Sequence, residues 1–179
     1  MTEEMLKLAS DFFGNLFSTS DMGSDESVFG LVEKRVTADM NDFLLQQFIE
    51  EDISYAIKMM APLKAPDIDG FSAIFFQRYW HIFESKISSY CLSILNRESE
   101  MGDINKTRIV LIPKAHKPKN LSQFRPISLC NVVYKTIMKI LVNCMSAILG
   151  NCINEAQGAF SQEDIFQIMC LLLMRLFIL

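Results

Sequence analysis

The chain has 179 residues, of which half are hydrophobic and about a fifth are charged. This composition excludes a disordered chain and suits one globular domain or a large piece of a longer protein. With only 7 glycines and 5 prolines, collagen-like and low-complexity architectures are also excluded.

Positive charge is concentrated in residues 104–154, although the whole chain has a net charge of −4. That stretch has eight basic residues and no acidic one, so the remainder carries a net charge of −12. Such a stretch predicts either a surface for a phosphate-bearing partner or an ordinary solvated basic surface. Charge alone does not choose between the two.

The five cysteines form no CxxC pair and there are only two histidines, so the usual zinc-site patterns are excluded. Several of the cysteines lie among apolar residues, and the first residues lack the features of a secretory signal. Both observations predict an intracellular protein, in the nucleus or the cytoplasm. The apolar segment 168–179 is shorter than a membrane span and contains Arg175, so we expect no membrane partner.

The first part of the chain is predicted to be helical. Apolar residues at helical spacing predict a helix from Glu4 to about Phe17, followed by a polar loop. A second helix is expected to begin near Thr37, whose hydroxyl would cap it. A third is expected over Glu50–Met60, with acidic residues in its first turn. The apolar residues expected to face inward from the second helix are Met40, Phe43, Leu44 and Phe48.

The remainder predicts a hairpin between helices. Residues 62–70 form a proline-rich turn, and residues 72–97 form helix again, with a kink near Trp80. The β-branched run Thr107–Pro113 predicts a strand, and Phe124–Leu129 the returning strand, with Pro126 at an edge or a bulge. A long amphipathic helix should cover 131–149. The fold class is therefore α+β, helix-dominated, with a small β-hairpin.

Four short motifs in this order resemble the plant type of non-LTR (LINE-type) retrotransposon reverse transcriptase. Each motif alone is weakly specific, but the four together, in the family's order and approximate spacing, are a strong signal. The resemblance extends over most of the chain and fades after Phe160. The motifs are residues 64–66 and 69–71 (KAP and DGF), 111–114 (LIPK), 124–135 (FRPISLCNVVYK) and 157–160 (QGAF).

The resemblance implies an N-terminal fragment of such a polymerase, with its fingers and early palm. The implied organisation is a helical segment at 1–61, a partial reverse-transcriptase domain at 62–160 and a divergent apolar tail at 161–179. It also implies RNA or DNA template and dNTP as partners. Mg²⁺ is implied as the cofactor of the full-length family, and no cofactor is expected in this fragment.

The resemblance further implies three residues that bind nucleotide or template. Lys114 and Arg125 occupy motif positions on the fingers hairpin, and Lys64 matches a position near the template backbone. An Arg fork and a Lys point charge suit a polyphosphate. The alternative is that Lys114 and Arg125 are solvated charges at strand ends.

The sequence differs from the family's pattern in the first motif and at the positions of the catalytic aspartates. The family's Gly-Pro in the first motif is replaced by Asp67-Ile68, and its palm aspartates have no counterpart. There is no Asp-Asp pair, and Glu163 and Asp164 are the only acidic residues after Phe160. Because two-metal nucleotidyl transfer needs such carboxylates, we expect no catalytic residue here and no polymerisation by this chain alone.

Two other interpretations remain open. Asp67 and Asp69 could hold a metal ion in a transferase, but the ordinary alternative is a turn closing on Gly70, with Asp69 bonded to nearby backbone. The chain could also be a degenerate helical protein that self-associates through uncovered apolar faces and has no biochemical activity.

Overall fold

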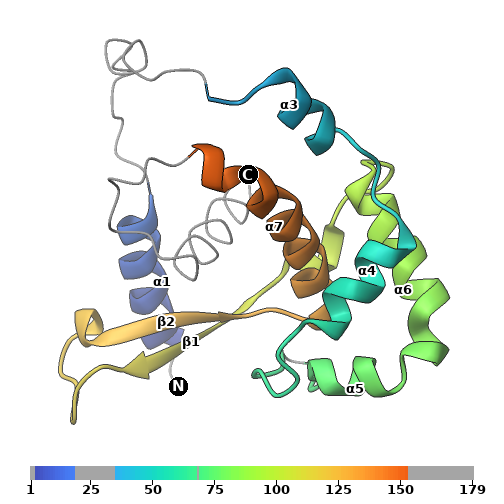
Figure 1. Ribbon diagram of the computed structural model, residues 1–179. Helices are drawn as coiled ribbons and strands as arrows, with labels where there is room; N and C mark the ends of the chain where they lie inside the picture. Colours follow the sequence, from blue (N-terminus) through green and yellow to red (C-terminus); the bar gives the residue numbers. More distant parts are fainter. Residues whose placement is uncertain (1–2, 19–34, 68, 153–179) are drawn as a thin grey trace. The chain divides into compact units, whose positions relative to one another are not determined.

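The computed structural model describes residues 3–18, 35–67 and 69–152. The described residues are mostly helical, with one two-stranded antiparallel sheet, which confirms the helix-dominated α+β class (Figure 1). The chain divides into two compact units. Of the described residues, the hairpin unit contains the N-terminal helix and Val110–Ile127, and the helical unit contains residues 35–109 and 128–152.

Most of the predicted helices are confirmed. Their bounds are α1 Glu3–Phe17, α3 Ala38–Leu44, α4 Glu50–Lys58, α5 Ala73–Arg78, α6 Trp80–Leu95 and α7 Val132–Cys152, with short 3₁₀ turns η1 Gly102–Asn105 and η2 Leu121–Gln123. Thr37 caps α3 by accepting a hydrogen bond from the Met40 backbone N–H at 3.3 Å. Asp52 in the acidic first turn of α4 accepts one from the Ile49 N–H at 3.0 Å. The predicted kink near Trp80 is the break between α5 and α6.

One prediction about packing is wrong in part. The helix after Thr37 ends at Leu44, none of its residues is buried, and Phe43 is 40% exposed. Phe48 lies beyond the helix end and packs against the core as a partly buried residue. Met40 and Leu44, one turn apart on the helix, are half-buried, so the prediction is wrong for Phe43.

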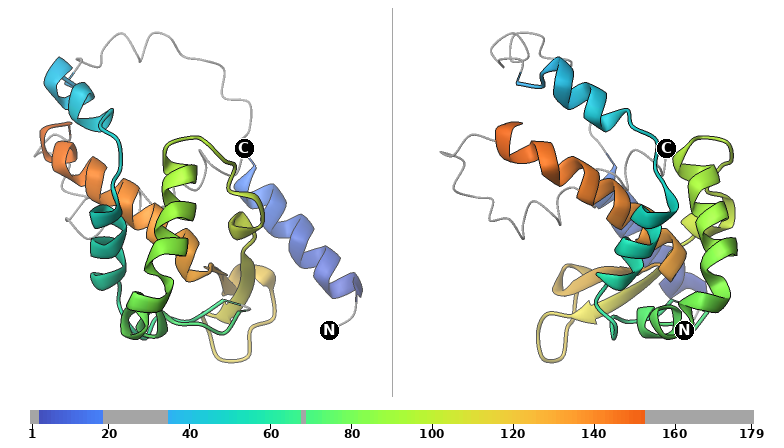
Figure 2. Two further views of the ribbon diagram at one scale, coloured as in Figure 1. Left: turned by 90° about the vertical axis from the view of Figure 1, so that its right-hand side faces the viewer. Right: turned by 45° about the vertical axis from the view of Figure 1, so that its right-hand side comes forward.

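The core of the helical unit lies where α4, α6 and α7 pack together (Figure 2). Ile53, Ile57, Cys91 and Ile137 are almost completely buried there. By length and composition alone α7 could span a membrane, but many of its residues, Ile137 and Val142 among them, are buried in this core. Packing therefore accounts for part of its apolar character.

A glutamine closes the end of α4. The Gln77 side-chain amide donates to the carbonyls of Ile57 and Met60 at 2.8 Å each and of Lys58 at 3.3 Å. These carbonyls are at the helix end, where intrahelical partners run out. The contact joins α5 to α4 and so fixes both ends of the proline-rich turn between them.

The strands are β1 Arg108–Pro113 and β2 Phe124–Leu129, as predicted. Beyond them the Lys114 N–H donates to the Gln123 carbonyl at 2.7 Å, which places Lys114 opposite Gln123 and Arg125 opposite Ile112. In this register Pro113 and Pro126 both occupy positions whose backbone groups form no hydrogen bonds between the two strands. A two-stranded sheet has only edge strands, so the expectation for Pro126 is confirmed.

Candidate nucleic-acid interface

Lys114 and Arg125 lie on the same face of the hairpin. Side chains alternate along a strand, so Lys114 shares a face with Ile112, and Arg125 is the cross-strand neighbour of Ile112. Lys114 and Arg125 are therefore diagonal neighbours, a relation that separates residues by about 7–8 Å. Two cations at this spacing can contact one polyphosphate or two adjacent phosphates of a strand.

Both cations are available to a ligand. Lys114 is exposed, and its ammonium donates to the Ser122 carbonyl at 3.0 Å, which leaves further N–H donors for another acceptor. Arg125 is exposed, and within the described part of the chain its guanidinium has no partner. Neither is paired with a carboxylate among the described residues.

The loop between the strands adds to this positive surface. His116, Lys117 and Lys119 are exposed, and residues 110–127 contain no acidic side chain. The loop is organised by Gln123, whose side-chain oxygen accepts from the Lys119 N–H at 2.7 Å while its own N–H donates to the Asn120 carbonyl at 3.0 Å. The sequence alone carries no signal for this role of Gln123, because only the strand register shows that Gln123 lies across from Lys114.

The same face also carries exposed aliphatic side chains. Val110, Ile112 and Ile127 are 37%, 44% and 40% exposed, and strand alternation places them with Lys114 and Arg125. Apolar groups between cations suit a single nucleic-acid strand, which presents base faces as well as phosphates.

Lys64 belongs to the helical unit, on the turn between α4 and α5, and is exposed. This turn is held at several points. The Ile74 N–H donates to the Pro62 carbonyl at 3.1 Å, and the Lys135 ammonium reaches from α7 to the Ala65 carbonyl at 3.0 Å. The turn that carries Lys64 is thus fixed to two helices.

The Asp67 and Asp69 segment is a local turn. The Asp69 carboxylate accepts from the Phe71 N–H at 3.1 Å, and the Gly70 N–H donates to the Asp67 carbonyl at 3.1 Å. Gly70 has a φ of +72°, a conformation that glycine adopts without strain. This arrangement agrees with the ordinary alternative for Asp67 and Asp69, a turn that closes on Gly70. Among the described residues no group of three His, Cys, Asp or Glu side chains could hold a metal ion.

Several motif residues have structural roles. Asn131 caps α7, accepting from the Tyr134 N–H at 2.8 Å and donating to the Ile104 carbonyl at 3.2 Å. Cys130 is buried, and this burial raises the pKa of its thiol, while a hydrogen bond with Thr107 and the charge of Lys135 act in the opposite direction. Lys135, also in the third motif, bonds to the Ala65 carbonyl and so joins the third motif to the first.

The chain is similar to one curated protein whose name states its origin. It is 24% identical over 153 residues to the "Transposon TX1 uncharacterized 149 kDa protein" of Xenopus laevis. The aligned part covers 84% of this chain but spans only 12% of that protein's length. No known family profile matches the chain. The chain is thus distantly related to a transposon-encoded protein.

Proposed function

We propose that this chain is the fingers and early-palm part of a non-LTR retrotransposon reverse transcriptase, and that its basic hairpin binds template and dNTP. The single observation that carries the proposal is the exposed hairpin face, on which Lys114 and Arg125 are diagonal neighbours and neither is paired with a carboxylate of the described residues. The motif resemblance and the distant similarity to a transposon protein support it.

The proposed role of the hairpin is electrostatic. Each phosphate that a Lys or Arg neutralises releases bound counterions, so affinity falls as salt rises. Lys114 offers a point charge and Arg125 a planar fork, and the loop lysines extend the same potential. Lys64 is proposed to contact the template backbone from its braced turn.

The proposed role does not include bond formation. The full-length family uses Mg²⁺ held by palm aspartates, and this sequence has no matching carboxylates. Purified chain is therefore expected to incorporate no dNTP in a primer-extension assay with Mg²⁺. Incorporation above the level of a heat-inactivated sample would overturn this part of the proposal. We further propose that the chain acts inside the cell, in the nucleus or the cytoplasm.

Binding is tested by charge reversal. The double variant Lys114→Glu/Arg125→Glu is compared with Arg78→Glu/Lys86→Glu, which changes net charge equally at exposed positions of the helical unit. Fluorescence anisotropy with a single-stranded RNA should show at least a tenfold weaker affinity for the hairpin variant. The slope of log K against log salt should fall by about 1.4, because two phosphate contacts are lost.

The control variant should lose much less affinity and keep the slope. Equal losses of RNA affinity in the two variants would show that the hairpin contributes only non-specific electrostatic attraction. RNA binding that survives the hairpin reversal would favour the second candidate, a self-associating helical protein without activity. The observation favouring that candidate is the exposure of large apolar side chains, of which Leu45, 72% exposed, is an example.

A further inference from the structure

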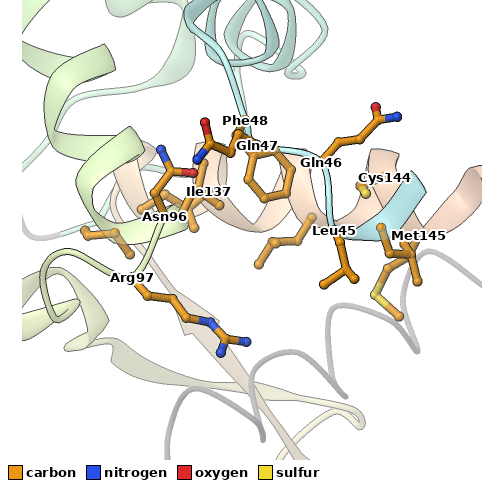
Figure 3. Close-up of a pocket in the computed structure, with 13 residues that line it drawn as sticks. Leu45, Gln46, Gln47, Phe48, Asn96, Arg97, Ile137, Cys144 and Met145 are labelled. Carbon is orange, nitrogen blue, oxygen red and sulfur yellow. The ribbon is translucent and has the colours of Figure 1, made fainter. Parts of the chain in front are cut away.

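A groove runs along α7 in the helical unit and has no role in the proposed function. Its main hollow has a volume of about 450 Å³ and lies between α7, the end of α6 and the linker after α3 (Figure 3). A second hollow of about 280 Å³ adjoins it and shares Gln46, Gln47, Phe48 and Cys144. The two hollows therefore form one groove with the linker at its rim.

The floor of this groove is apolar. Ile137, Leu141 and Met145 follow one another along α7 at helical spacing and line it together with Phe48. Leu45 at the rim is 72% exposed, and α3 beside it contributes no buried residue. Apolar surface left open in this way is favourably covered by another apolar segment.

We propose that the groove is the docking site of residues 168–179 of the same chain. These twelve residues are apolar except for Arg175. The described part of α7 ends at Cys152, only eight residues, or about 12 Å of helix, beyond Cys144. Fifteen residues, 153–167, separate Cys152 from the apolar segment and can span roughly 50 Å when extended, so the segment reaches the groove easily.

Connection through the chain favours this occupant over a second copy. A short linker keeps the segment at an effective concentration of the order of millimolar near the groove. A second copy of the chain at micromolar concentration would have to compete for the groove with this much higher effective concentration of the tethered segment. The segment supplies leucine, isoleucine, methionine and phenylalanine side chains for the groove, and Arg175 is expected to face solvent.

Two native cysteines allow a direct test. Cys144 lines the groove and Cys170 lies in the apolar segment. In a Cys152→Ser background, the full chain at low micromolar concentration is treated with a short bismaleimide and digested for mass spectrometry. We expect a Cys144–Cys170 cross-link within monomeric chain. Cys91, which is completely buried, should remain unlinked and reports that the fold is intact.

A second variant tests the same docking without relying on the length and direction of a cross-linker. Leu172→Asp/Leu176→Asp should raise the rate of iodoacetamide labelling at Cys144 at least fivefold, while labelling of Cys91 stays slow. A cross-link found only between two chains would assign the groove to a second copy and overturn the proposal. So would a Cys144 labelling rate that the aspartates leave unchanged.

Discussion

The helical unit and the hairpin differ in where their apolar side chains lie. In the helical unit Ile53, Ile57 and Ile137 are at most 1% exposed and pack between three helices. In the hairpin unit Ile112 and Ile127 are 44% and 40% exposed. Isoleucine therefore forms a buried core in the helical unit, which also has exposed isoleucines such as Ile82, whereas both isoleucines of the described hairpin unit are exposed.

The difference teaches that stability and binding reside in different parts of the chain. Buried isoleucines contribute to the free energy of folding in proportion to the area removed from water. Exposed isoleucines beside Lys114 and Arg125 contribute little to folding and remain available to a ligand. Changes in the two regions should therefore affect different measurements.

The largest expected effect is on folding. Ile137→Ala should lower the free energy of unfolding by about 2–5 kcal/mol, because it leaves a cavity in a completely buried site. Ile112→Ala, on the exposed face of β1, should lower it by less than about 1 kcal/mol. Urea titration followed by circular dichroism measures both. Equal losses would show that the hairpin belongs to the same packed core.

The next effect is a loss of stability at alkaline pH that arises in the helical core. Burial raises the pKa of Cys91 from 9.0 to about 12. Below pH 9 both folded and unfolded chains hold the proton, whereas between pH 9 and 12 only the unfolded chain releases it. The folded state should therefore lose about 1.4 kcal/mol per pH unit in this window.

Cys91→Ala should remove this part of the loss. Between pH 8.5 and 10.5 the wild type should lose about 2 kcal/mol more unfolding free energy than the variant, measured by urea titration under reducing conditions. Cys152→Ser, near the end of α7, should retain the wild-type loss. If Cys91→Ala shows the full wild-type loss, ionisation of this thiol does not drive it.

Local sequence signals predicted the elements well. The predictions were correct for the cap at Thr37, the acidic first turn at Asp52 and the helix break near Trp80. Caps and periodicity act within one or two helical turns, so the local sequence is enough to locate them. Phe43 was wrongly expected to face inward, because periodicity does not tell whether a short helix has anything to pack against. The hairpin strands were also correct, and Pro113 and Pro126 fit the register that the Lys114–Gln123 bond sets.

Long-range side-chain contacts could not be predicted in the same way. Lys135 bonds the Ala65 carbonyl seventy residues earlier, and Gln77 bonds three carbonyls at the end of α4. Such partners depend on how helices pack, which spacing along the chain does not encode. The motif resemblance named Lys64, Lys114 and Arg125 but did not indicate that Lys135 and Asn131 would hold the surrounding backbone.

The smallest expected effect compares two residues with positive φ, one in each region. Arg97 has a φ of 61° and follows α6, where the Glu98 N–H donates to the Ser93 carbonyl at 2.7 Å and the Arg97 N–H to the Ile94 carbonyl at 3.0 Å. This is a Schellman motif, whose left-handed position favours glycine. Arg97→Gly should therefore stabilise the helical unit by about 0.5 kcal/mol and leave RNA affinity nearly unchanged.

Lys117, with a φ of 55° in the hairpin loop, is the matched position. Lys117→Gly relieves the same backbone conformation but removes a cation from the basic surface. Its urea midpoint should stay within error of the wild type, because the hairpin contributes little to the cooperative core. Its RNA affinity should fall about twofold, and its salt slope by about 0.7 if Lys117 contacts a phosphate. If Arg97→Gly weakened RNA binding as much as Lys117→Gly did, binding would not be confined to the hairpin, and the contrast between the two regions would fail.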